Sequence, residues 1–144
     1  MRRRIMTAAA ALCVLITSCG IPNAKNTAAD AVDFSGEWSE EADGAVVIDI
    51  WSEAEGVWNG EISRVDGDDT VSFWSFTGTA AGNTLKYSDM SRVIGKYDNE
   101  GEVTEETVYE GGSGSIILKK DKLSWKDDIE DAGKGMTFIY SGEY

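Results

Sequence analysis

From residue 34 onward the chain alternates short apolar and β-branched runs with glycine-containing acidic turns. Within several runs the apolar residues recur at every second position, as in Val46, Ile48 and Ile50. A period of two places apolar side chains on one face of an extended chain, so these runs predict half-buried β-strands. The predicted strands are 36–41, 45–51, 57–64, 70–79, 84–90, 93–97, 104–109, 113–119, 122–126 and 136–140.

The breaks between these runs have the composition of tight turns. The turns are expected at 53–56, 66–69, 81–83, 98–101 and 120–121. Short connections favour neighbouring antiparallel strands, and no apolar stripe of period 3.6 precedes Asp127. We therefore predict an all-β domain over 34–144, an antiparallel up-and-down barrel of about eight to ten strands.

The first 33 residues have a different character. Arg2–Arg4 precede an apolar run from Ile5 to Ile16, and Thr17-Ser18-Cys19 follows. This arrangement resembles a bacterial lipoprotein signal, which implies a signal peptide over 1–18, lipidation of Cys19 and an extracytoplasmic protein anchored to the cell membrane or the outer membrane. The apolar run is shorter than the ~20 residues of a membrane-spanning helix. Residues 19–33 are then the lipidated cysteine and a flexible polar tether.

The start of the domain carries a second resemblance. Phe34-Ser-Gly36-Glu-Trp38 resembles the aromatic-x-Gly-x-Trp signature of lipocalins and, more loosely, of fatty-acid-binding proteins and avidins. The resemblance implies a calycin-like barrel in which Trp38 closes one end. The later part, with Trp74-Ser-Phe76-Thr-Gly78 and Lys122-Leu-Ser-Trp125, is similar to a group of small bacterial lipoproteins of no known activity.

The charge of the chain limits its partners. Without the three N-terminal arginines, ten of the 13 basic residues remain against all 26 acids, a net charge of −16. Such a field repels nucleic acid and favours a cationic partner. The segment 98–110 holds six acids and no base, which is typical of a solvated hairpin or a protected edge strand. The candidate partner-binding residues are Trp51, which falls on an outward face, with Glu102, Glu105 and Glu106.

The residues for most catalytic mechanisms are missing. The chain has no histidine, and Cys19 would carry lipid, so Ser-His-Asp and Cys-His catalysis and imidazole or thiolate zinc sites are excluded. We expect no enzymatic activity and no cofactor. The acidic turn 66–69 offers oxygen ligands, as does a second loop with weak candidates for calcium at Asp127, Asp128, Glu130 and Asp131, but neither follows the EF-hand spacing, and both also fit solvated turns.

The aromatic residues leave two binding hypotheses open. Inward faces are predicted for the candidate ligand-binding residues Trp38, Trp58, Trp74, Trp125 and Tyr87, which would otherwise form the core. The leading hypothesis is a non-catalytic binding module that holds a small apolar or amphipathic ligand in the barrel. The alternative is an anionic interaction or inhibitor protein that binds a cationic partner at the envelope. A carboxylate-based glycan hydrolase is a third reading, which no particular pair of acids supports.

Overall fold

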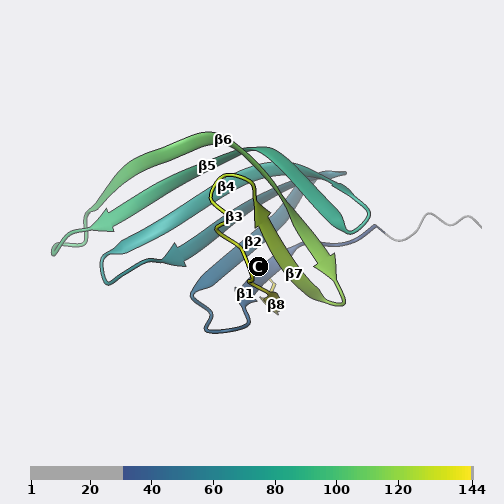
Figure 1. Ribbon diagram of the computed structural model, residues 1–144, viewed down its shortest axis with the longest axis horizontal. Helices are drawn as coiled ribbons and strands as arrows, with labels where there is room; N and C mark the ends of the chain where they lie inside the picture. Colours follow the sequence, from purple (N-terminus) through teal and green to yellow (C-terminus); the bar gives the residue numbers. More distant parts are fainter. Residues whose placement is uncertain (1–30, 144) are drawn as a thin grey trace, which may run out of the picture. The chain divides into compact units, whose positions relative to one another are not determined.

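Eight antiparallel strands follow one another around a closed barrel in the computed structural model, which describes residues 31–143 (Figure 1). Each strand pairs with the next along the chain, and β1 pairs with β8 to close the ring. The strands are β1 (Gly36–Glu40), β2 (Val46–Ala54), β3 (Val57–Val65), β4 (Thr70–Ala81), β5 (Thr84–Tyr97), β6 (Val103–Lys119), β7 (Lys122–Asp127) and β8 (Phe138–Gly142). The predicted all-β antiparallel barrel is confirmed at this level.

The expected signal peptide, Cys19 and the tether up to residue 30 lie outside the described residues. The compact unit that holds the barrel begins at Val32, whose side chain packs against the core. Within residues 31–143, no helix has the length and hydropathy needed to span a bilayer.

Eight strands replace the ten predicted because two pairs of predicted strands are continuous. The runs 84–90 and 93–97 are joined in β5, and 104–109 and 113–119 are joined in β6. The pairing of β5 with β6 shifts register three times between Tyr87 and Val93. Each β-bulge adds a residue and interrupts the alternation of faces, so a bulge looks like a strand end in the sequence.

The centre of the barrel is filled by side chains at alternate strand positions. Val46, Ile48 and Ile50 are each at most 1% exposed, as their period of two predicted. Trp74 packs edge-to-face on Trp125, with 5.3 Å between ring centroids. Such buried aromatic pairs contribute about 0.5–1.5 kcal/mol beyond the burial of their area.

The segment before β1 closes one end of the barrel. Phe34 is fully buried and packs edge-on against Trp58, with 5.5 Å between ring centroids. The indole N–H of Trp38 donates to the Phe34 carbonyl at 3.0 Å. This hydrogen bond fixes the chain where it enters the barrel, and the Phe34 ring fills the opening.

Candidate binding groove on the outer face

A groove of about 340 Å³ crosses the outer face of the barrel over strands β2 to β5. Its volume lies near the lower end of the ~300–1,000 Å³ typical of small-molecule sites. The lining residues are Trp51, Glu53, Asn59, Gly60, Glu61, Ser75, Phe76, Thr77 and Asp89. Three of these carry a carboxylate and none is basic, so the groove is negatively charged at neutral pH.

Trp51 comes from β2 and occupies the outward position that the sequence predicts. Its neighbour Ile50 is fully buried, and side chains alternate across the strand, so the indole faces outward and is partly exposed. Trp51 stands opposite Asn59 of β3. It also lines an adjoining groove of about 410 Å³, to which Asp33 and Glu143 add two further carboxylates.

Two of the groove acids stand at irregularities of the sheet. Glu53 lies where the pairing of β2 with β3 shifts register, between Ser52 and Ala54. Asp89 lies where β5 carries one more residue than β4 between their paired positions. β-Bulges bend a strand and redirect side chains, and they are frequent beside functional sites. Here they place acids on two sides of the groove.

Acidic residues also form a row across three strands of the outer face. Glu37 of β1 is paired with Asp49 of β2, and Asp49 is paired with Glu61 of β3. Like charges directly opposite on neighbouring strands are destabilising. The row therefore departs from the pairing that favours sheet stability, as functional sites often do.

Hydrogen bonds fix the polar wall of the groove. The Thr77 hydroxyl donates to Asn59 Oδ1 at 2.8 Å, and the Thr77 backbone N–H donates to Asp89 Oδ1 at 3.0 Å. Ser75 and Ser91 share a hydroxyl hydrogen bond of 2.9 Å on the same face. These bonds hold the lining in position before any ligand arrives, which reduces the entropy cost of binding.

The five candidate ligand-binding aromatics lie in the interior, in two groups. Trp74, Trp125 and Tyr87 meet in the core, where the Trp125 indole N–H donates to Tyr87 Oη at 2.9 Å. Trp38 and Trp58 lie beside Phe34 at the closed end, and Trp58 is only partly buried. Their role toward a ligand stays a prediction.

Burial raises the pKa of the Tyr87 hydroxyl well above its ordinary value, although the hydrogen bond from Trp125 opposes the shift. The hydroxyl also donates to the Lys126 carbonyl at 3.2 Å. Tyr87 also stacks on Phe76, with 4.8 Å between ring centroids. Its hydroxyl is thus a neutral, satisfied part of the core.

The structure does not bring the two sets of partner-binding candidates together. Glu102 precedes β6, and Glu105 and Glu106 lie within it, all three exposed. Strands β3, β4 and β5 separate β6 from the strand that carries Trp51. The acidic arm and the tryptophan are therefore two surfaces.

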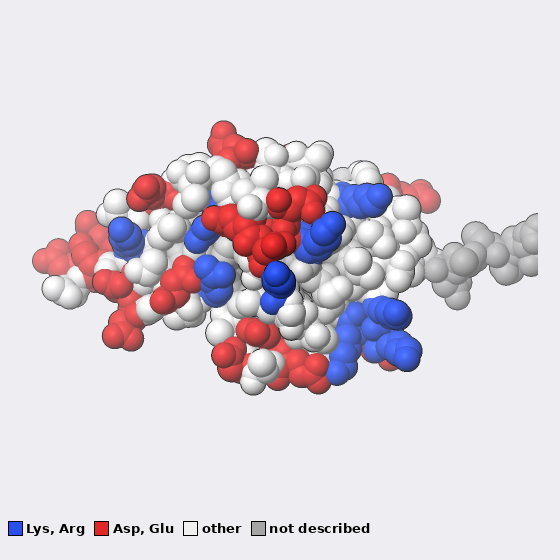
Figure 2. All heavy atoms as spheres, in the orientation of Figure 1, with Lys and Arg blue, Asp and Glu red and all other residues white. Residues whose placement is uncertain are grey.

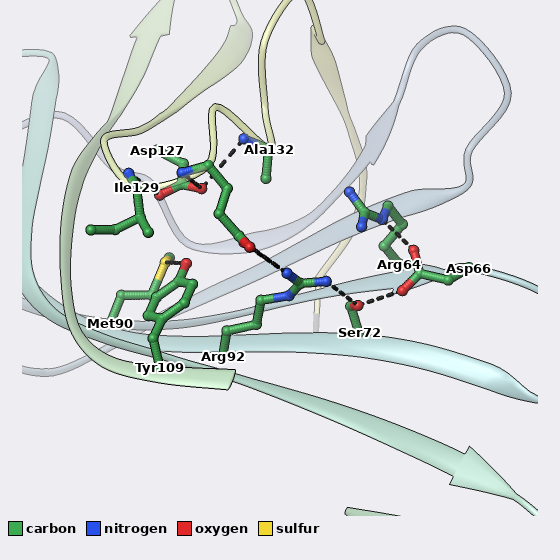
Figure 3. A network of polar contacts seen from close by, with 10 residues as sticks. Arg64, Asp66, Ser72, Met90, Arg92, Tyr109, Asp127, Ile129 and Ala132 are labelled. Atoms are coloured by element: carbon green, nitrogen blue, oxygen red, sulfur yellow. Dashed lines mark hydrogen bonds and ion pairs between the residues drawn. The ribbon is translucent and has the colours of Figure 1, made fainter. Parts of the chain in front are cut away.

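A network of polar contacts joins residues of β3, β4 and β5 to the connection after β7 (Figure 3). Arg92 of β5 binds both carboxylate oxygens of Glu130, at 2.6 and 2.8 Å, and donates to the Ser72 hydroxyl at 3.1 Å. Ser72 donates in turn to Asp66, whose other oxygen accepts from Arg64 at 2.6 Å. The network ties the connection between β7 and β8 to the barrel wall.

Both arginines of this network lie over the ring of Trp74, each 5.0 Å from its centroid. Burial favours a higher pKa for Asp66, but hydrogen bonds from Ser72 and Arg64 and the charge of Arg64 outweigh it and lower that pKa. The cations are neutralised by acids of the protein. The network therefore has a structural role.

Three of the four weak calcium candidates have protein partners. Asp127 is 1% exposed and accepts the backbone N–H groups of Ile129, Glu130 and Ala132. Asp128 accepts from Ser113 at 3.1 Å, and Glu130 is bound to Arg92. Over the part of the chain that the structure describes, no group of three or more acids or other ligating side chains could hold a metal ion.

Sequence reasoning did not single out Glu53, Glu61 and Asp89 as site residues. Glu61 was within reach, because the inward assignment of Ile62 implies that its neighbour faces outward. Its place opposite Asp49 could not be read from the turn at 53–56, because the register shift at Glu53 sets the pairing. Asp89 had no signal, since a bulge in β5 sets its direction.

The sheet and the groove define an all-β barrel protein with an anionic, tryptophan-containing surface site. Comparison with protein-family models, with curated proteins and with solved structures finds no match.

Proposed function

We propose that this chain is a lipid-anchored, non-catalytic binding module with a calycin-like barrel, and that it binds a cationic partner through the groove around Trp51. The supporting observation is the groove itself, which combines an indole with Glu53, Glu61 and Asp89 and has no basic lining residue among residues 31–143. The partner's recognised group is an alkylammonium or guanidinium, carried by a basic protein or a polyamine.

The chemistry of such a group matches the lining. A cation over an indole gains about 0.5–1 kcal/mol at an exposed site and more where water is excluded. The carboxylates supply charge-assisted hydrogen bonds, which are about twice as strong as neutral ones. A bound cation also relieves the repulsion between Asp49 and Glu61, which stand opposite each other.

The packed interior makes the outer groove the better supported site. A ligand in the barrel would have to displace the Trp74–Trp125 pair or the Phe76–Tyr87 stack. Closely packed cores resist such insertion at a cost of typically about 1–3 kcal/mol or more. A ligand in the outer groove displaces neither of these buried aromatic pairs.

Isothermal titration of the protein, purified in a non-ionic detergent, with spermidine and with trilysine tests the proposal. We expect both probes to bind, and binding to weaken steeply as salt rises, because exposed charges are screened within about 10 Å at 0.1 M salt. Trp51→Leu and Glu61→Gln should each weaken binding, whereas Asp68→Asn removes an exposed charge outside the groove and should not. Equal losses in all three variants, or no binding, would contradict the proposal. Binding of trilysine alone would indicate a basic protein as the partner, and binding of spermidine alone would indicate a polyamine.

The lipid anchor has its own test. Arg2–Arg4, the apolar run and Cys19 support the lipid anchor. The non-catalytic role is supported by the absence of histidine and of a second cysteine after residue 18. Mass spectrometry of the mature protein should find an N-terminal acylated Cys19. The Cys19→Ser variant should leave the membrane fraction. An unmodified Met1 or a Cys19→Ser variant that stays in the membrane would refute the anchor and leave the groove proposal untouched.

A further inference from the structure

The first half of β6 is an open edge of the sheet. β6 pairs with β7 only from Gly114 to Lys119, whereas β5 pairs with it from Val103 onward. Within residues 31–143, the stretch Val103–Gly112 thus has a strand on one side only, as Figure 1 shows for the hairpin of β5 and β6. Such an edge presents backbone N–H and C=O groups that can pair with another chain.

This part of β6 is also exposed on both faces. Every residue from Val103 to Val108 is exposed, and these two valines are 44% and 41% exposed. The outer face beside them carries Tyr97 at 41% and Phe73 at 38%, and the Phe73 and Val103 side chains converge over Gly95. Strands normally bury one face, so the apolar surface here is available to an added strand.

The charge of this edge selects its partner. Glu102, Glu105, Glu106 and Glu110 belong to none of the ion pairs found over the described residues. Figure 2 shows acids gathered over the end where β5 turns into β6, while the lysines of the turn between β6 and β7 lie elsewhere. A second copy of this edge would bring the same acids face to face, which disfavours self-pairing.

We propose that the free edge of β6 between Val103 and Glu110 accepts an extended basic segment of a partner protein, which adds to the sheet as a further strand. Backbone hydrogen bonds would supply the affinity, and alternate side chains would supply the selectivity. Basic residues would meet Glu105 and Glu106, and apolar residues would meet Val103 and Val108. The inference goes beyond the proposed function, because it concerns a surface that Trp51 does not line.

The test uses the eight-residue peptide Lys-Val-Thr-Lys-Lys-Thr-Val-Lys, whose valines can stand opposite Val103 and Val108 and whose central lysines can stand opposite Glu105 and Glu106, and the same peptide N-methylated at every second residue. N-methylation keeps the charge and removes the hydrogen bonds along one edge. We expect the first peptide to bind and to slow hydrogen exchange of amides in 103–112, and the methylated peptide to bind about tenfold more weakly or worse, a difference of about 1.4 kcal/mol. Equal binding of the two peptides, or no binding, would overturn the proposal.

Variants separate this surface from the groove. Glu105→Gln combined with Glu106→Gln should weaken binding of the peptide. Glu55→Gln combined with Asp68→Asn changes the net charge equally and should leave binding unchanged. If Trp51→Leu or Glu61→Gln abolishes peptide binding and the β6 variant does not, the edge proposal fails and the groove proposal stands. If only the β6 variant abolishes peptide binding, the edge proposal stands, whether or not spermidine binds in the groove.

Discussion

Asp49 and Glu61 stand directly opposite each other on β2 and β3, both on the outer face of the barrel. Like charges directly opposite on neighbouring strands are destabilising. Trp51 lies two residues along β2 from Asp49, on the same face. The arrangement costs stability in the free protein and attracts a cation.

Replacing Glu61 should therefore stabilise the fold while it weakens binding. We expect Glu61→Gln to raise the free energy of unfolding by about 0.2–1 kcal/mol, because it removes one like-charge cross-strand pair. Urea unfolding measures this change, and Asp68→Asn, at an exposed turn position, is the matched control. A destabilised Glu61→Gln protein would show that Glu61 supports the sheet and would count against a binding role.

Acid should weaken the polar end of the barrel through Asp66. Its pKa is lower in the folded protein than the ordinary value of about 4, so the folded state holds fewer protons there than the unfolded chain. The contribution is complete above the ordinary pKa and is lost as the pH falls through the lowered one. The stability difference between wild type and Asp66→Asn should shrink from pH 6 to about pH 2. A constant difference would mean that the Asp66 charge contributes nothing.

The Tyr87 hydroxyl should matter more than its size suggests. Tyr87→Phe leaves the buried Trp125 indole N–H without its acceptor, and such an orphaned group costs about 1–3 kcal/mol. Tyr97→Phe is the control, since Tyr97 is 41% exposed. Urea midpoints of the two variants decide the matter, and equal midpoints would show that water replaces the lost partner.

Alkaline titration tests the same residue independently. The pKa of Tyr87 is raised in the folded state, so its contribution is present below the ordinary value near 10 and is lost as the pH rises toward the raised one. In wild type, absorbance at 295 nm should include a late tyrosine ionisation that coincides with unfolding. Tyr87→Phe should lack that late step, and its persistence would assign the step to another tyrosine.

The ring of Phe34 should be required for a closed barrel end. Phe34→Ala removes a fully buried ring that packs on Trp58, and comparable truncations cost about 3–5 kcal/mol. Val65→Ala, at a valine that is 63% exposed, should change stability by no more than about 0.5 kcal/mol. The free energies of unfolding give the comparison, and a small loss at Phe34 would mean that the closure contributes little.

Most of the fold could be predicted from the alternation of apolar and polar residues along the strands. Val46, Ile48 and Ile50 alternate without interruption, so their strand and its buried face were predictable, and so was the outward position of Trp51. The bulges in β5 were not, because a bulge depends on how two strands pair, and Met90 is the single apolar residue between Ser88 and Arg92. The sequence pattern therefore predicts two strands where the structure has the single strand β5.

The candidate site was predictable only in part for the same reason. Trp51 follows from the period of its own strand. The contact of Arg92 with Glu130 joins residues 38 positions apart, and the network that includes Asp66 depends on the path of the connection after β7. The charge composition predicts an anionic protein. The pairing among the four strands from β2 to β5 determines which residues share the groove, and the composition does not give it.

The central claim is that a cation binds at Trp51 on the outer face. The most direct measurement is a nitrogen–proton correlation spectrum of the five tryptophan indole groups, recorded during titration with trilysine at low salt and assigned with Trp51→Phe. With a cation bound at Trp51, the Trp51 signal should move most, the Trp74 and Trp125 signals should stay, and added salt should reverse the change. Movement of Trp74 or Trp125 with a still Trp51 would contradict this claim and place the ligand inside the barrel.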